Sequence, residues 1–270
     1  MERNTAIALI GFGAIGRKVV ELARKAPGGS PIRVVLVRPD RVSAVRGALP
    51  TEIAVVGTLD ALFALKPGLV AECAGHGAVR QYGAAVLARG IDFLVASTGA
   101  LADAATEAAL REAAGDGGAQ VLVPAGAIGG ADLIGAARLG GLERVTYTSR
   151  KKPVAWKGTP AEKLLDLDRL TAATPFFRGP AREAALAYPQ NANVAATVGL
   201  AGLGLDRTTV VLTADPDAPG NEHGIDVEGA FGKASFRIAG RTLPDNPKTS
   251  MLAALSVAHA ILQRGQRFVI

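Results

Sequence analysis

One short segment near the start of the chain restricts the possible folds more than any other feature. An apolar run over Thr5–Ile10 leads into Gly11-Phe-Gly-Ala-Ile-Gly16, which has the spacing G-x-G-x-x-G and opens a predicted helix. Gly11 would make a tight turn, Gly13 would let the backbone approach a pyrophosphate, and Gly16 would let helix and strand pack closely. The helix N-terminus would offer unpaired N–H groups to the pyrophosphate. We predict a dinucleotide site at this turn, with contacts from Gly11, Gly13, Ala14, Ile15 and Gly16.

Short apolar runs alternate with longer Ala- and Leu-rich segments through the first half of the chain. The runs that predict strands are Ala6–Ile10, Ile32–Val37, Ile53–Val56, Leu69–Glu72 and Phe93–Ala96. The segments that predict helices are Ala14–Lys25, Leu59–Leu65, Ala78–Arg89 and Asp103–Ala114. Strands that are apolar throughout and separated by helices are typical of a parallel sheet covered on both faces. Right-handed crossovers then predict an α/β fold, the Rossmann doubly wound parallel sheet.

The pattern changes after about Gln120. Val121–Val123 predicts another strand, and a glycine-rich turn leads to a helix that starts at Ala131. Further strands are predicted at Arg144–Ser149, Thr209–Ala214, Gly224–Glu228 and Ala234–Ile238, with a helix at Ala181–Ala187 and a small-residue segment at Asn193–Gly204. We predict a dinucleotide-binding domain over residues 1–120 and an α+β domain for substrate binding and dimerisation over 121–245. Residues 246–270 are predicted to pack back on the first domain, with Asn246–Ser250 as the start of a helix over Met251–Leu262.

The end of the second predicted strand bears on the choice between NAD and NADP. NAD-specific sites place Asp or Glu about 20 residues after the glycines, where it accepts from the ribose 2′-OH. Here the strand ends Val37-Arg38-Pro39-Asp40. Arg38 can bind a 2′-phosphate, or it can be a solvated strand end with Asp40 beside the ribose. The sequence leaves NAD or NADP open as the cofactor.

Composition excludes several classes of partner. The net charge is +6, but the 30 basic residues are scattered and no nucleic-acid-binding module is present, so no nucleic acid is expected. Cys73 is the single cysteine, which excludes an intramolecular disulfide and a cysteine-cluster metal site. No apolar run approaches the roughly 20 residues that span a bilayer. We expect a soluble, cytoplasmic protein that binds no metal and no membrane.

Histidines and one basic segment are the candidates for chemistry. His76 follows the fourth strand, at the edge where open α/β sheets bind ligands, and Ala74 and Gly75 beside it are predicted to contact the cofactor. His223 precedes a strand and rates no higher than His76 on position, while His259 lies in an apolar helix. Cations and hydroxyls that would suit a substrate with carboxylates are Arg150, Lys151, Lys152, Thr159 and Lys248.

Taken together, the motifs resemble the L-aspartate dehydrogenase family over nearly the whole chain. The specific elements are Glu72-Cys-Ala-Gly-His76, Gly126-Ala-Ile-Gly129, Arg150–Pro153, Trp156-Lys-Gly-Thr-Pro160, Pro189–Thr197, Ala201–Asp206, Gly229-Ala-Phe-Gly232 and Asn246–Ser250. The chain departs from the family pattern at Glu222, where an apolar neighbour of the histidine is expected.

The resemblance implies reversible, NAD(P)-dependent oxidative deamination of L-aspartate to iminoaspartate, which hydrolyses to oxaloacetate and ammonia. It also implies a link to NAD biosynthesis and a homodimer. The family's active-site histidine falls on His223, and its cofactor contacts fall on Ala127 and Asn193. His76 would serve as a hydrogen-bond donor to the substrate beside the basic residues named above. The competing predictions are a reductase related to dihydrodipicolinate reductase and a non-catalytic NAD(P)-sensing protein.

Overall fold

The computed structural model describes residues 6–189, 193–244 and 246–269, which form two compact units. The first unit comprises the described residues up to Ala100, Ala104–Pro124 and those from Ala253 onward. The second comprises Leu101–Asp103 and Ala125–Leu252. Among the described residues, no helix is both long and apolar enough to span a bilayer.

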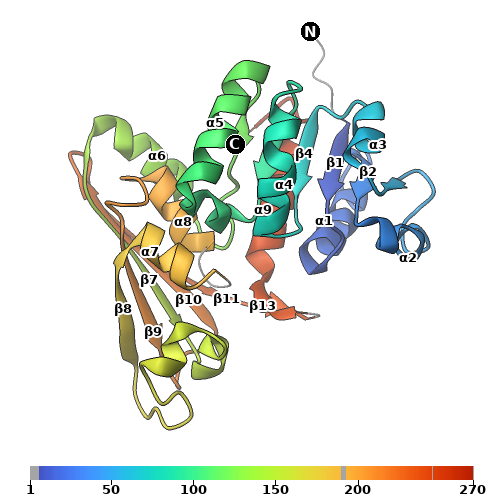
Figure 1. Ribbon diagram of the computed structural model, residues 1–270. Coiled ribbons are helices and arrows are strands. Elements are labelled where there is room, and N and C mark those ends of the chain that lie inside the picture. The colour runs from blue at the N-terminus through green and yellow to red at the C-terminus, as the bar shows by residue number, and fades with distance from the viewer. Residues whose placement is uncertain (1–5, 190–192, 245, 270) are drawn as a thin grey trace. The chain divides into compact units, whose positions relative to one another are not determined.

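The first unit is built on a six-stranded sheet with the order β3-β2-β1-β4-β5-β6, and all its strand pairs are parallel (Figure 1). The strands are β1 (Ile7–Ile10), β2 (Ile32–Leu36), β3 (Ala54–Val56), β4 (Leu69–Glu72), β5 (Asp92–Val95) and β6 (Val121–Leu122). Every residue of β1 and β4 is buried, as expected for strands covered on both faces. The predicted Rossmann doubly wound sheet is confirmed.

Helices cover both faces of this sheet. They are α1 (Ala14–Arg24), α2 (Val42–Arg46), α3 (Leu59–Ala64), α4 (His76–Leu87), α5 (Ala104–Gly117) and α9 (Met251–Gln263), with 3₁₀ turns η1 (Pro39–Arg41) and η2 (Thr98–Ala102). Val19 of α1 and Val257 of α9 share one core cluster with Leu94 of β5. The preceding residue, Phe93, points to the opposite face and lies against Gly83 of α4. The C-terminal helix therefore completes the core of the first unit.

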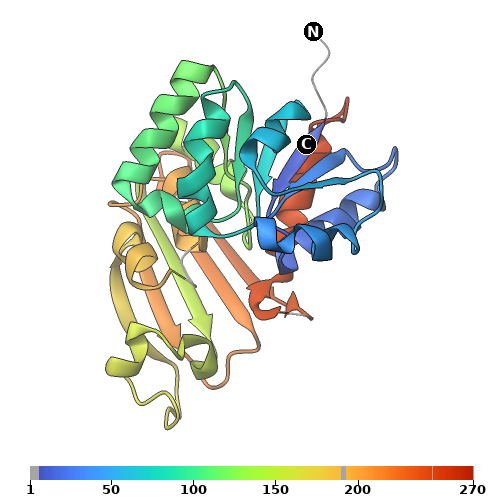
Figure 2. The same cartoon turned by 45° about the vertical axis from the view of Figure 1, so that its right-hand side comes forward.

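The second unit contains a five-stranded sheet with the order β11-β10-β7-β9-β8, whose long strands run side by side in both views (Figures 1 and 2). The strands are β7 (Leu142–Lys151), β8 (Thr174–Pro180), β9 (Thr209–Ala214), β10 (Asn221–Gly229) and β11 (Gly232–Gly240). β7 and β9 are parallel, and the other pairs are antiparallel. The remaining elements are α6 (Ala131–Gly140), α7 (Ala181–Ala187), α8 (Asn193–Ala201), η3 (Pro153–Trp156), η4 (Pro160–Lys163), β12 (Thr242–Leu243) and β13 (Asn246–Ser250).

The core of the second unit lies between one face of this sheet and its helices. Tyr147 of β7 and the fully buried Trp156 belong to the same cluster as Ile134 of α6, Ala184 of α7 and Val198 of α8. Tyr147 is one of the buried side chains on this face, and a shift of the register by one residue would turn them to the opposite face.

Three details of the second half differ from the sequence prediction. β8 was not predicted, because it contains Pro175 and Pro180; both are tolerated since β8 is an edge strand. β10 begins at Asn221, so His223 lies inside the strand and not before it. The segment Asn246–Ser250 is not a helix start but β13, which pairs with β12, and the helix begins only at Met251.

Candidate functional site

The glycine loop after β1 has the geometry that its sequence predicts. Gly11 has φ +96°, and a Cβ there would lie 2.7 Å from the Cβ of Ala74 and 2.9 Å from the carbonyl oxygen of Cys73. A Cβ on Gly16 would lie 2.5 Å from the carbonyl oxygen of Gly11. Gly13 is the N-cap of α1, and a Cβ on it would meet no atom within 4 Å, so its backbone is open to a ligand. The loop fits a dinucleotide pyrophosphate.

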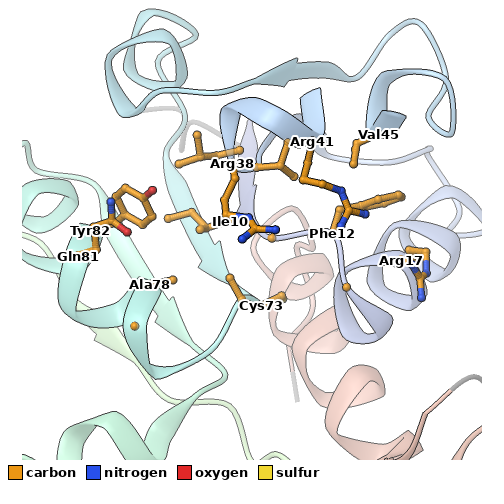
Figure 3. A pocket seen from close by; sticks show the side chains of 16 residues that line it. Ile10, Phe12, Arg17, Arg38, Arg41, Val45, Cys73, Ala78, Gln81 and Tyr82 are labelled. Carbon is orange, nitrogen blue, oxygen red and sulfur yellow. The ribbon is translucent and has the colours of Figure 1, made fainter. Parts of the chain in front are cut away.

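This loop borders a cavity of about 650 Å³ at the carboxyl ends of β1, β2 and β4 (Figure 3). Its walls come from the glycine loop, from the end of β2 with Arg38, and from Ala74 and the α4 residues Gln81 and Tyr82. The carboxyl edge of an open parallel sheet is where such folds bind nucleotides, and the volume suits a small-molecule ligand.

A buried carboxylate shapes the wall that faces Gly11. Glu72, at the end of β4, is fully buried, and its Oε1 accepts the N–H groups of Ala74 and Gly75, both at 2.6 Å. Ser97 donates its N–H to Oε2 and its hydroxyl to Oε1, both at 3.0 Å. Burial raises the pKa of Glu72, and these hydrogen bonds oppose the rise. No role was predicted for Glu72 from the sequence, although a lone carboxylate at the end of an apolar strand is a signal for one.

The predicted cofactor contacts are divided between the two units. Gly11, Gly13, Arg38 and Ala74 line the cavity. Gly75, with φ +112°, is the N-cap of α4, while Gly16 packs against Gly11, and Ala14 and Ile15 form the first turn of α1. Ala127 is buried in the loop before α6, and Asn193 is the exposed first residue of α8 in the second unit. These assignments stay predictions.

His223 is the centre of a second group of residues, in the second unit. Its side chain is 3 % exposed, and its Nδ1 lies 2.8 Å from the hydroxyl of Tyr147. Burial, and next the positive charge of Lys151, lower the pKa of His223 to about 3. The imidazole is therefore neutral at neutral pH and can accept a proton.

Lys151 lies on the same face of the sheet as His223. In the β7–β10 register His223 pairs with Ser149, so the alternate β7 residues Tyr147, Ser149 and Lys151 share the face of His223. Lys151 is 7 % exposed, its Nζ lies 5.4 Å from the centroid of the Trp156 ring, and burial lowers its pKa to about 8. We refer to Tyr147, Lys151 and His223 as the histidine cluster.

Arg150 belongs to the opposite face of the sheet. Its guanidinium forms salt bridges with Asp215 and, at 2.9 Å, with Glu222, its direct partner in the register. These two carboxylates raise the pKa of Arg150, Asp215 first. The acidic residue before His223 thus points away from the imidazole, which explains how the chain accommodates this departure from the family pattern.

The other predicted substrate contacts lie on separate elements of the fold. Lys152 is exposed at the N-cap of η3. The Thr159 hydroxyl donates to the carbonyl oxygen of Trp156 at 2.6 Å and accepts the N–H of Ala161 at 3.2 Å. His76 is the half-buried first residue of α4, and the side chain of Lys248 in β13 lies outside the described part. Their roles in substrate binding stay predictions.

No functional role was predicted for Tyr147 from the sequence. Alternation along the predicted strand places Tyr147 on the face of Lys151, but its partner His223 is 76 residues away in the chain. Only the strand pairing brings the two together.

Among the described residues, no group of three or more His, Cys, Asp or Glu side chains could hold a metal ion.

Two family models match the chain. Residues 11–124 match the homoserine dehydrogenase NAD-binding domain, and residues 132–264 match the C-terminal domain of aspartate dehydrogenase. The first match covers the glycine loop and the cavity, and the second covers the histidine cluster.

Curated relatives and a solved structure match over nearly the full length. The chain is 49 % identical to an L-aspartate dehydrogenase of Polaromonas sp., covering 98 % of this chain and 99 % of the relative. It is 48 % identical to an L-aspartate dehydrogenase of Ruegeria pomeroyi, covering 96 % and 92 %. The crystal structure of aspartate dehydrogenase from Thermotoga maritima is 25 % identical, covers 98 % of each chain and superposes with a TM-score of 0.76. The chain therefore belongs to the L-aspartate dehydrogenase family.

Proposed function

We propose that the protein catalyses the reversible, NAD(P)-dependent oxidative deamination of L-aspartate. The observation that carries the proposal is the buried, neutral imidazole of His223, fixed by Tyr147 within the part of the chain that matches the aspartate dehydrogenase C-terminal domain. L-Aspartate and NAD(P)+ would give iminoaspartate, NAD(P)H and a proton, and water would convert iminoaspartate to oxaloacetate and ammonium.

The cofactor, when bound, accepts the hydride from the substrate Cα, and this chain's residues would bind and orient it. Gly11 and Gly13 fit the pyrophosphate, because a Cβ on Gly11 would collide with Ala74 and the backbone at Gly13 is open. Glu72 would hold the opposite wall through the N–H groups of Ala74 and Gly75. Arg38 borders the same cavity and can bind a 2′-phosphate, while Ala127 and Asn193 are the further contacts that the family resemblance supports.

His223 would move the proton that the reaction requires. Its neutral imidazole can take a proton from the substrate ammonium, or it can activate the water that attacks the imine. Tyr147 occupies Nδ1, so Nε2 is the nitrogen that would carry out the transfer. A pKa of about 3 makes a weak base, but a bound dicarboxylate would offset the charge of Lys151 and raise that pKa.

Lys151 is the favoured partner for a substrate carboxylate. It lies on the face of His223, and an anion beside it would stabilise the ammonium form that burial disfavours. Arg150 already has two carboxylate partners, so we place it behind Lys151 as a candidate. Lys152, Thr159, Lys248 and His76 complete the set from which the second carboxylate contact would come.

We further propose that the enzyme acts in the cytoplasm as a homodimer and supplies iminoaspartate for NAD biosynthesis, with small molecules as its ligands and no nucleic acid or membrane partner. The single cysteine, which is buried, suits a reducing compartment. The family resemblance and the β-rich second unit support the dimer.

The reverse reaction, reductive amination of oxaloacetate, tests this proposal. Purified protein is mixed with oxaloacetate and ammonium, and the absorbance of NADPH or NADH is followed. We expect oxidation that requires both oxaloacetate and ammonium. Oxidation without ammonium would identify a keto-acid reductase, and absence of oxidation with bound cofactor would identify another substrate or a sensor; either result overturns the proposal.

A further inference from the structure

The turn after β2 presents two arginines to the cavity. Pro39 starts the 3₁₀ turn η1, and the N–H of Arg41 donates to the carbonyl oxygen of Arg38 at 2.8 Å. Arg38 is the extended N-cap of η1 and Arg41 is its last residue, so the turn carries one arginine at each end. Both line the cavity beside the glycine loop, and Figure 3 shows both side chains extending from the turn over it.

A third arginine reaches the cavity from α1. Arg17 lies in the first turn of the helix, where its N–H donates to the carbonyl oxygen of Gly13 at 2.9 Å, and its side chain lines the same cavity (Figure 3). Within the described part of the chain, neither Arg17 nor Arg41 forms a salt bridge. The cavity wall thus carries three guanidinium groups, and none of its lining residues is Asp or Glu.

The acidic residue of the turn η1, Asp40, does not suit the ribose of NAD. Asp40 is 66 % exposed, lies outside the set of lining residues, and its Oδ1 is 3.7 Å from Arg38 Nε, beyond hydrogen-bond distance. An NAD-selective site needs a carboxylate that accepts from the ribose 2′-OH at this position. Three cations without such an acceptor favour a ligand with additional negative charge.

We propose that this cavity selects NADP(H) over NAD(H), with the 2′-phosphate held between Arg38 and Arg41 and attracted by Arg17. The inference rests on the proposed function only in taking this cavity as the dinucleotide site. A 2′-phosphate carries close to two negative charges at neutral pH, and planar guanidinium groups bind such oxygens in pairs. Arg38 and Arg41 determine specificity, and Arg17 adds long-range attraction.

Binding of cofactor fragments tests the proposal without any turnover. The full-length protein is titrated by calorimetry with adenosine 2′,5′-bisphosphate and with adenosine 5′-monophosphate, which differ only in the 2′-phosphate. We expect the bisphosphate to bind at least about tenfold tighter. Arg38→Gln and Arg41→Gln should each remove most of this advantage and leave binding of the monophosphate within about twofold.

Arg24→Gln is the matched control, because Arg24 is exposed in the last turn of α1 and does not line the cavity. This variant should keep the full advantage of the bisphosphate. Equal binding of the two nucleotides by the wild-type protein overturns the proposal even if the arginine variants fail to fold. Loss of the advantage in Arg24→Gln overturns it too, because net charge would then explain the preference. The experiment is separate from the proposed function, since a protein inactive on aspartate can still discriminate the two nucleotides.

Discussion

The hydroxyl of Tyr147 lies 2.8 Å from Nδ1 of His223, and the two rings are nearly parallel, with centroids 6.0 Å apart. The residues come from adjacent antiparallel strands, in which His223 faces Ser149 and Tyr147 is the next residue on the same face. Both side chains are buried, and burial raises the pKa of Tyr147, so the phenol keeps its proton. Tyr147 thus fixes the orientation of the imidazole without competing for its proton.

Tyr147→Phe should therefore lower kcat for L-aspartate without weakening cofactor binding. The substitution removes one hydrogen bond, worth about 1 kcal/mol net, so we expect a loss of about five- to tenfold in kcat. Because the hydroxyl also tunes the imidazole, the pH profile of kcat should shift, which a purely structural role would not cause. Tyr188→Phe is the control: Tyr188 is buried in the aromatic cluster around Trp156 and Phe176. An unchanged kcat and pH profile in Tyr147→Phe would contradict this role.

The depressed pKa of His223 predicts a loss of stability in acid. The pKa of His223 is about 3 in the folded protein, whereas the ordinary pKa of a histidine side chain is 6.5. As the pH falls from 6.5 towards 3, the unfolded chain binds a proton that the folded protein does not, so the free energy of unfolding falls. His223→Asn should remove this contribution. Denaturant unfolding of both proteins across this range should show the wild-type advantage shrinking with acidity, and His259→Asn, at an exposed site, should show no such trend.

The buried ammonium group of Lys151 should lower the free energy of unfolding at neutral pH. Burial lowers its pKa from 10.5 to about 8, so the folded state disfavours the ammonium that the unfolded chain carries up to pH 10.5. Its unfavourable contribution is complete below pH 8 and disappears as the pH rises towards 10.5.

Lys151→Met should accordingly raise Tm at pH 7, raise KM for L-aspartate by about tenfold or more, and leave the Kd of NADPH unchanged. The matched control is Lys163→Met, at an exposed position in η4, which should alter neither Tm nor KM substantially. A lower Tm for Lys151→Met, or an unchanged KM, would refute the role given to this lysine. Thermal scans and initial rates at one pH suffice for the comparison.

Glu72→Gln should weaken cofactor binding through the backbone that Glu72 holds. Glutamine has one acceptor oxygen, so its amide group would face an N–H donor from Ser97 or from the Ala74–Gly75 turn. A buried donor left unsatisfied costs about 1–3 kcal/mol, which should lower Tm. Because Ala74 contacts Gly11, the Kd of NADPH should rise as well. The exposed Glu52→Gln provides the control, and an unchanged Kd in Glu72→Gln would show that the wall tolerates the change.

The features that could be predicted from the sequence are those set by local pattern. The glycine spacing at Gly11–Gly16 and the fully apolar runs predicted the parallel sheet, and the motif set predicted the family. The histidine cluster depends on the pairing of β7 with β10, and the alternation along one strand does not reveal which distant strand pairs with it. β8 was missed because its two prolines are acceptable only at an edge, and edge position is a tertiary property.

The arginines that follow β2 could likewise be recognised only in part from the sequence. Arg38 was recognised as a candidate from its place after the strand, whereas the importance of Arg41 depends on the 3₁₀ turn that places it at the same cavity. The contribution of Arg17 depends on the cavity itself. The functions of all these residues remain predictions that the experiments above address.

The proposed role of His223 in transferring the proton during aspartate oxidation is tested by His223→Ala. Steady-state turnover of L-aspartate with NADP+ is measured beside the Kd of NADPH for the wild-type protein and the variant. We expect a loss of about 10²–10⁴-fold in kcat, with the Kd of NADPH within about twofold of wild type. Near-normal turnover in a variant that still binds NADPH would contradict it.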